Sequence, residues 1–212
     1  MSSAISPKCK LCRREGVKLM LKGDRCFLDK CAFETRSYAP GQHGANARRK
    51  RLGGGSYAEQ LREKQKIKRT YGMEEGQFRN LFDKALHMKG MTGENFLRLL
   101  ELRLDNIAFR MGFAPSRRSA RQLVGHGHFQ VNGRRVNVPS FTLKAGDTVT
   151  VSEQSNKLNV IHAALQSSRR GSGVEWLNVD KVKLTGSVIA VPSRDQIPTP
   201  VNEQLVVELF SK

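Results

Sequence analysis

The sequence is short of acidic residues, has little tryptophan, and confines its cysteines to one end. Its 212 residues include only 19 Asp and Glu against 37 Lys and Arg, which gives a formal net charge of +18. Such an excess opposes compaction unless a polyanion neutralises it. Nucleic acid is therefore the expected partner, and an anionic membrane surface is the alternative.

Several other features are missing. No stretch approaches the roughly twenty apolar residues of a membrane-spanning helix. Signal-peptide and lipidation patterns are absent from the sequence, as are the Gly-x-Ser-x-Gly and P-loop motifs. We therefore expect a cytoplasmic protein without catalytic residues, membrane contact or a small-molecule substrate.

The positive charge is concentrated toward the beginning of the chain. Residues 1–56 hold 13 basic and 4 acidic side chains, a difference of +9, whereas residues 156–212 hold 7 and 5, a difference of +2. The densest cluster is Arg48, Arg49, Lys50 and Arg51, between segments rich in glycine. We predict direct RNA contact there, with a solvated tail or a localisation signal as the alternative.

The four cysteines form two close pairs, with the pattern C-x2-C-x13-C-x4-C. They are Cys9, Cys12, Cys26 and Cys31. This spacing predicts one structural zinc ion held by four thiolates, which would leave no open position for a substrate. An iron–sulfur cluster is the chemical alternative, and ordinary thiols or two disulfides are the others. Nearby cations, among them Lys10 and Arg13, are expected to lower the thiol pKa values.

The middle of the chain predicts helices. Ser56-Tyr57-Ala58-Glu59 fits a capping box, and Gly72 suits the end of that helix after Tyr71. This helix is basic, with Lys64, Lys66, Lys68 and Arg69. Apolar residues at helical spacing predict a second helix from Phe78 to Leu86 and a third, continuous one over residues 94–111.

A short helix and a hairpin follow. Ser116 is the predicted N-cap of a helix that runs to about Val124 and places Arg117, Arg118 and Arg121 on one face. Residues 129–136 predict a hairpin with Asn132-Gly133 as its two-residue turn, followed by Arg134 and Arg135. These arginines favour binding to RNA phosphates, and a solvated helix face is the alternative.

The last part of the chain predicts strands at 148–151, 174–179 and 184–191, in a sheet expected to be antiparallel. Trp176 is expected to pack in the core rather than to stack on a base. A loop at 192–200 and a short helix at 202–210 complete the prediction.

Two other classes of protein are disfavoured. His126 and His128 flank a glycine and suggest acid–base or metal chemistry, yet no carboxylate lies at helical spacing from them. We interpret them as turn residues that contact RNA. A DNA-binding zinc protein is also disfavoured, because no recognition helix with base-reading side chains follows the cysteines.

The segments Leu102-Arg103-Leu104-Asp105-Asn106, Ser116 to Val124, His126-Gly127-His128 and Val131-Asn132-Gly133 together resemble the S4 RNA-binding module. This module also occurs in pseudouridine synthases and tyrosyl-tRNA synthetases. The order of Tyr38-Ala39-Pro40-Gly41-Gln42-His43-Gly44, the basic helix, the module and Val138-Pro139-Ser140 extends the resemblance to the whole bacterial-type S4 family of small-subunit ribosomal proteins. The cysteine spacing resembles its zinc-binding members.

The resemblance implies an α+β fold. It consists of a zinc-clipped arm (1–50), a helical domain (51–95) onto which 192–212 pack, and an inserted RNA-binding domain of helices on a small antiparallel sheet (96–191). It further implies binding to the 5′ domain of 16S-type ribosomal RNA, nucleation of subunit assembly, contact with ribosomal protein S5 and other small-subunit proteins, a place near messenger RNA at its entry channel, and a part in translational accuracy. A non-ribosomal RNA-binding or RNA-modification accessory protein is the alternative.

The patterns and the resemblance together give the residues expected to contact RNA. They are Arg13, Arg14, Arg36, Tyr38, His43, Arg48, Arg49, Lys50, Arg51, Lys64, Lys66, Lys68, Arg69, Ser116, Arg117, Arg118, Arg121, His126, His128, Asn132, Arg134 and Arg135.

Overall fold

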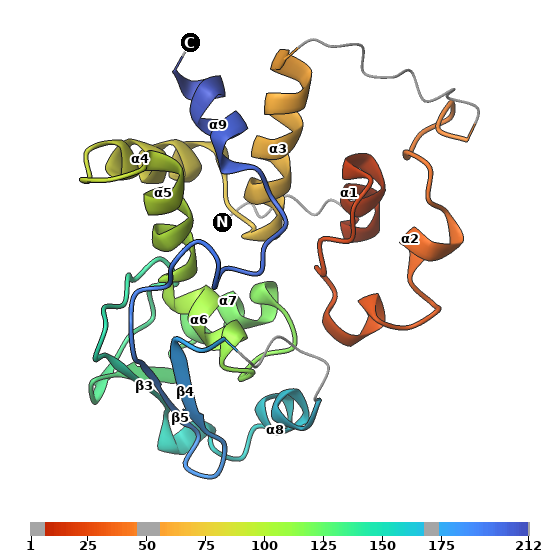
Figure 1. Cartoon of the computed structure of the whole chain (residues 1–212). Coiled ribbons are helices and arrows are strands. Elements are labelled where there is room, and N and C mark those ends of the chain that lie inside the picture. Colours follow the sequence, from red (N-terminus) through yellow and green to blue (C-terminus); the bar gives the residue numbers. More distant parts are fainter. Residues whose placement is uncertain (1–6, 46–55, 168–173, 212) are drawn as a thin grey trace. The chain divides into compact units, whose positions relative to one another are not determined.

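The computed structural model describes residues 7–45, 56–167 and 174–211 (Figure 1). The chain divides into two compact units, one of Met1–Phe78 with Pro200–Lys212 and one of Arg79–Thr199. The predicted RNA-contacting cluster at residues 48–51 lies outside the described residues. None of the helices in the described part is long and apolar enough to cross a membrane.

The first unit is helical. It contains α1 (Lys8–Glu15), the 3-10 turn η1 (Gly23–Cys26), α2 (Ala32–Thr35), α3 (Ser56–Thr70) and α9 (Glu203–Phe210). The predicted basic helix is thus confirmed, and Gly72 follows it with a φ of 62° that suits glycine. Asn202 caps α9, because its side chain accepts a hydrogen bond from the backbone N–H of Gln204.

Helices α3 and α9 lie side by side although they are far apart in the sequence (Figure 1). Gln60 donates to Glu208 across a distance of 2.9 Å, and the rings of Phe78 and Phe210 have centroids 6.2 Å apart. The end of the chain therefore completes the core of the first unit.

The second unit combines helices with a sheet. Helix α4 (Glu75–Leu86) crosses the boundary between the units in the sequence, and the elements that follow it are α5 (Thr92–Glu101), α6 (Leu104–Arg110), α7 (Arg117–Gly125), β1 (Phe129–Val131), β2 (Arg134–Arg135), β3 (Thr148–Val151), the 3-10 turn η2 (Glu153–Ser155), α8 (Asn159–Gln166), β4 (Leu177–Asp180) and β5 (Thr185–Val188). The strands at 174–179 and 184–191 are shorter than predicted, and α8 was not predicted.

The strands form one antiparallel sheet in the order β2-β1-β3-β5-β4. Leu104, Ile107, Phe113 and Phe129 belong to the hydrophobic core of this unit. Trp176 is also in this core, with 2% of its surface exposed, so the predicted packing role is confirmed. A mixed fold with a small antiparallel sheet is therefore confirmed.

The prediction of one continuous helix over residues 94–111 is wrong. Arg103 is extended, with φ −70° and ψ 138°, and separates α5 from α6. Its neighbours bond to another segment, since Leu104 N donates to Phe141 O and Leu143 N donates to Leu102 O. The apolar periodicity continues through this point because both helices have a buried apolar face, with Phe96 and Leu100 on α5 and Leu104 and Ile107 on α6.

The hairpin has the predicted turn. Asn132 and Gly133 both have positive φ, 49° and 77°, as a tight two-residue turn between β1 and β2 requires. The Asn132 side chain accepts from Thr148 N at 2.9 Å and donates to Asp147 at 2.8 Å. The turn is therefore fixed to the start of β3, and it places Arg134 and Arg135 on an exposed strand.

Candidate RNA interface

Helix α7 carries the predicted arginine cluster and begins at the predicted cap. The Ser116 hydroxyl oxygen accepts a hydrogen bond from the backbone N–H of Ser119. Ala120 and Val124 are buried, which leaves the arginines on the more accessible side of the helix. Of these, Arg118 is exposed, while Arg117 and Arg121 are partly buried.

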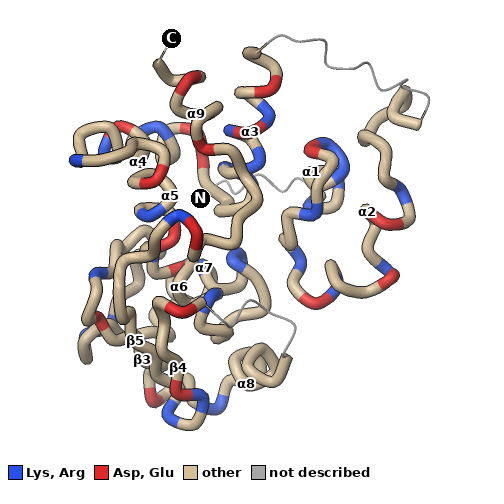
Figure 2. Tube along the Cα trace, in the orientation of Figure 1, with Lys and Arg blue, Asp and Glu red and all other residues tan. Residues whose placement is uncertain are grey.

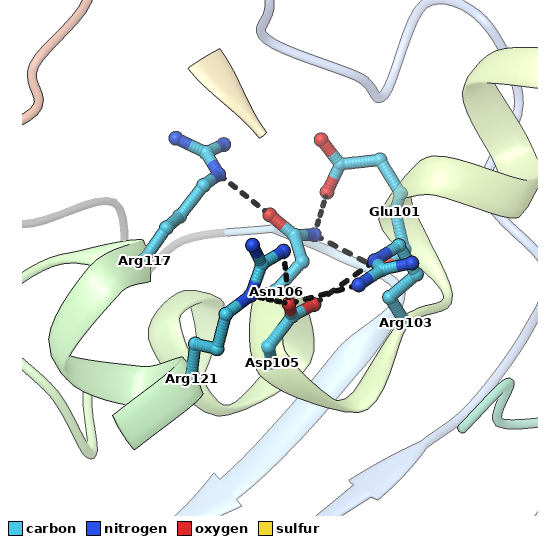
Figure 3. Close-up of polar contacts among 6 residues, drawn as sticks. All are labelled: Glu101, Arg103, Asp105, Asn106, Arg117 and Arg121. Atoms are coloured by element: carbon cyan, nitrogen blue, oxygen red, sulfur yellow. Dashed lines mark hydrogen bonds and ion pairs between the residues drawn. The ribbon is translucent and has the colours of Figure 1, made fainter. Parts of the chain in front are cut away.

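Arg121 is held by a carboxylate of α6. Its Nε and Nη2 lie 2.8 and 2.7 Å from Oδ2 of Asp105 (Figure 3). The same carboxylate also receives two hydrogen bonds from the Arg103 guanidinium, at 3.1 and 3.0 Å. Asp105 therefore neutralises part of the charge and fixes the direction of Arg121.

Arg117 is held by a side-chain amide of α6, that of Asn106. Its Nε donates to Oδ1 of Asn106 at 2.8 Å (Figure 3). Its guanidinium also lies 4.7 Å from the centroid of the Phe109 ring. A hydrogen bond donated by Nε and stacking on a ring together set the plane of the guanidinium. Because the amide is neutral, this contact leaves the charge of Arg117 in place.

The hairpin contributes a second basic group. Arg135 reaches back to the segment after α7, where its Nε donates to Gly127 O at 3.0 Å and its Nη2 donates to His126 O at 3.1 Å. The rings of His126 and His128 lie 6.0 Å apart. Burial, the charge of His126 and the charge of Arg135 all lower the pKa of His128 below its usual value.

The basic side chains of α3 are paired with acids of their own unit or of the adjoining α4. Lys64 and Lys68 both bind Glu75, Lys66 binds Glu63, and Arg69 binds Glu15. Figure 2 shows the corresponding mixture of basic and acidic positions along this helix. Although partial burial raises the pKa of Glu75, the hydrogen bonds from Lys64 and Lys68 and the charges of these lysines together lower it more.

The arm is attached to α3 through one carboxylate. Glu15 at the end of α1 is buried and meets both Arg62 and Arg69. Burial raises the pKa of Glu15 above its usual value, although Arg69 and Arg62 act in the opposite direction. This contact positions the arm on the basic helix.

The other predicted arm residues that the structure describes lie at or near the surface. Arg13 donates from Nε to Tyr38 O at 2.9 Å, and its guanidinium lies 4.8 Å from the centre of the Tyr38 ring. Arg14, Arg36 and His43 are exposed. The structure thus joins Arg13 to Tyr38.

The four cysteines are free thiols, of which Cys9 is partly buried and Cys12, Cys26 and Cys31 are buried. Burial raises the pKa of Cys12, and the charges of Cys26, Cys9 and Cys31 raise it further. Burial also raises the pKa of Cys26. The expected lowering of the thiol pKa values is therefore wrong for Cys12 and Cys26. Desolvation by burial is the largest influence on both thiols, and it outweighs a backbone hydrogen bond to each thiol and the charge of Lys22 near Cys26.

The donor set has the chemistry of a structural zinc site, with four thiols in one segment. Among the described residues, however, no three His, Cys, Asp or Glu side chains are grouped so that they hold a metal ion. The four cysteines, all of them described residues, supply suitable donor atoms, but the structure does not bring three of them together around one metal position.

Sequence reasoning missed the residues that hold the arginines, namely Glu101, Asp105 and Asn106. The available signal was the occurrence of polar residues in a segment otherwise rich in leucine. All three are buried, with 0%, 3% and 1% of their surfaces exposed. Polar groups this deep need specific partners, and here the partners are the arginines.

A helix with arginines held by the preceding helix, followed by a basic hairpin at the edge of a small sheet, defines a class of basic module suited to binding a polyanion. The comparisons with known proteins identify it. Residues 4–101 match the ribosomal protein S4/S9 N-terminal domain, and residues 102–149 match the S4 domain.

Full-length relatives agree with these matches. The chain is 53% identical over 212 residues to the small ribosomal subunit protein uS4 of Trichlorobacter lovleyi and 52% identical over 212 residues to that of Acidobacterium capsulatum, with all of each chain covered. It is 56% identical over 204 residues to the uS4A protein of Alkaliphilus oremlandii, covering 96% of each chain. The chain belongs to the ribosomal protein uS4 family.

Proposed function

We propose that this protein is a structural constituent of the small ribosomal subunit that binds directly to ribosomal RNA. The family consists of structural proteins and not of enzymes. The excess of 37 basic over 19 acidic residues suits binding to the RNA polyanion. The observation that carries the proposal is the presentation of Arg117 and Arg121 by α6, beside the exposed Arg118.

The contacts we propose are mainly with phosphates. Arginines presented on a helix and on an exposed strand donate paired hydrogen bonds to phosphate oxygens, and they need no access to the narrow major groove of an RNA helix. Arg134 and Arg135 extend this surface from the hairpin. The lysines of α3 are a second contact surface, on which RNA phosphates would replace the carboxylate of Glu75 as their partner.

The finer assignments rest on the family resemblance. They are binding to the 5′ domain of the 16S-type RNA, nucleation of subunit assembly, contact with ribosomal protein S5, a position near messenger RNA at its entry channel, and a contribution to translational accuracy. A chain whose predicted RNA contacts come from the arm, α3 and α7 is suited to join several RNA helices at one junction.

We also propose that Cys9, Cys12, Cys26 and Cys31 hold one structural zinc ion. Zinc would supply the arm with a cross-link, since this segment has few apolar residues to bury. Stoichiometric zinc in protein purified under reducing conditions is expected. Protein without metal, or with the absorption of an iron–sulfur cluster, would overturn the assignment.

Co-sedimentation tests the main proposal. The protein should sediment with the small subunit and be released only at high salt, because release of counterions makes phosphate binding steeply salt-dependent. Its affinity for a transcript of the 5′ domain should exceed its affinity for duplex DNA of the same length. Free migration at low salt, or equal affinity for the DNA, would contradict the proposal.

A further inference from the structure

We infer that Asn106 is a positioning residue for RNA binding, which fixes Arg117 in the orientation that contacts phosphate. The inference rests on the proposed function, since it concerns how the arginine is presented to RNA. Asn106 is outside the set of residues predicted to contact RNA, and it is buried, with 1% of its surface exposed. Its effect on RNA must therefore pass through another side chain.

The orientation of the Asn106 amide is determined by what lies behind it. Its Nδ2 donates to the backbone O of Glu101 at 2.9 Å and to Oε2 of the same residue at 2.7 Å. A reversed amide would place its oxygen against these two acceptors, so the hydrogen-bond partners define which atom is which. The amide oxygen is consequently directed at Arg117.

The group behind the amide is itself fixed. The Glu101 carboxylate accepts two hydrogen bonds from Arg110, from Nε at 3.0 Å and from Nη2 at 2.6 Å. Both side chains are buried, and a buried two-point ion pair has little freedom to move. Asn106 thus connects this buried ion pair to the partly exposed Arg117. Figure 3 shows Asn106 between Glu101 and Arg117.

Asp105, which precedes Asn106 in α6, also orients an arginine, but it carries a negative charge. Asp105 directs Arg121, which lies one helical turn after Arg117 in α7. As a carboxylate, Asp105 offsets charge, whereas the neutral Asn106 orients an arginine without offsetting it. The contact with Asn106 therefore orients Arg117 without reducing its attraction for a phosphate, whereas the contact with Asp105 offsets part of the charge of Arg121.

A double-mutant cycle measured on RNA affinity tests the inference. The ligand is a transcript of the 5′ domain of bacterial small-subunit ribosomal RNA. The variants are Asn106→Ala, Arg117→Ala and the double substitution, each checked for folding by circular dichroism. We expect Asn106→Ala to weaken binding by about fivefold and Arg117→Ala by about tenfold, the scale of one charge-assisted contact. The double variant should bind like Arg117→Ala.

Asn95 offers a matched control. It is a buried asparagine of α5 with 2% of its surface exposed, and it also accepts a hydrogen bond from an arginine, Arg98. Arg98 is not among the predicted RNA contacts. Asn95→Ala should lower stability as a buried amide substitution does, and leave RNA affinity unchanged.

Three outcomes would overturn the inference while leaving the proposed function intact. In the first, the fold-losses of RNA affinity for Asn106→Ala and Arg117→Ala multiply in the double variant. In the second, Asn95→Ala loses as much RNA affinity as Asn106→Ala. In the third, Arg117→Ala binds the transcript as tightly as the unmodified protein. If the unmodified protein itself does not bind the transcript, the proposed function fails, and the inference fails with it.

Discussion

The carboxylate of Glu101 and the guanidinium of Arg110 form a two-point ion pair with side chains only 0% and 7% exposed. The same carboxylate also accepts a hydrogen bond from Asn106. The ion pair therefore fixes the amide of Asn106, which in turn orients Arg117. A structural interaction in the core of the second unit is thereby coupled to the proposed RNA surface.

Breaking this pair should cost much stability. Arg110→Ala is expected to lower the free energy of unfolding by about 3–5 kcal/mol, because it leaves the charge of Glu101 buried without its main partner. Urea denaturation followed by circular dichroism measures this. Glu94→Ala, which removes a partly exposed ion pair with Arg98 on α5, is the control and should cost about 0.5 kcal/mol. Equal effects of the two substitutions would contradict the prediction.

Acid should weaken the contact between Glu75 and the lysines of α3. The pKa of Glu75 is lowered in the folded state, so its contribution to stability is present above the unfolded value of 4.5 and is lost as the pH falls through the lower folded value. In melting curves across this range, Glu75→Gln should lose less stability on acidification than the unmodified protein. Because the Glu75 side chain is 50% exposed, added salt should reduce the difference. A larger acid loss in the variant would refute this.

Glu15 should show the opposite pH dependence. Its pKa is raised, so the folded state favours the protonated form, and stability is lost as the pH rises from 4.5 through the raised folded value. Glu15→Gln keeps an oxygen for Arg62 and Arg69 but cannot ionise. The stability of the variant relative to the unmodified protein should therefore increase as the pH rises over this range. Thermal melts of both proteins measure it, and a relative decrease would show that the ion pairs outweigh desolvation.

The hairpin turn should favour glycine over a β-branched residue at position 133. Gly133 has a φ of +77° and open space where a Cβ atom would lie, so the cost of Gly133→Val is confined to the backbone. We expect a loss of about 1–2 kcal/mol in unfolding free energy. Gly125→Ala also meets open space, at the end of α7 and without positive φ, and it should be neutral or stabilising. Similar losses for both variants would exclude backbone strain as the cause.

Arg118 should contribute charge to RNA binding without contributing to the fold. It is exposed on α7, and Arg118→Ala is expected to reduce the slope of log affinity against log salt by about one, with an unchanged melting temperature. Lys183→Ala is the control, since Lys183 is exposed after β4 and outside the predicted RNA contacts. An unchanged slope for Arg118→Ala would place this arginine outside the interface.

Elements with local signals were predicted correctly from the sequence. Ser116 caps α7, Gly72 follows α3, and Asn132-Gly133 forms the turn, because each depends on the conformational preferences of a few adjacent residues. Helix α8 escaped prediction, since its two buried residues, Ile161 and Ala164, form too short a pattern to distinguish it from a loop.

The sequence by itself determined that the protein is basic, which helix bears the arginine cluster, and which family it resembles. Only the tertiary structure decided that Arg103 interrupts a helix, because its neighbours bond to residues 141–143. It alone decided that Asn106 and Asp105 hold Arg117 and Arg121, and that burial raises the pKa of Cys12. Caps and turns follow from neighbouring residues, whereas buried hydrogen bonds and desolvation depend on which distant segments the fold brings together.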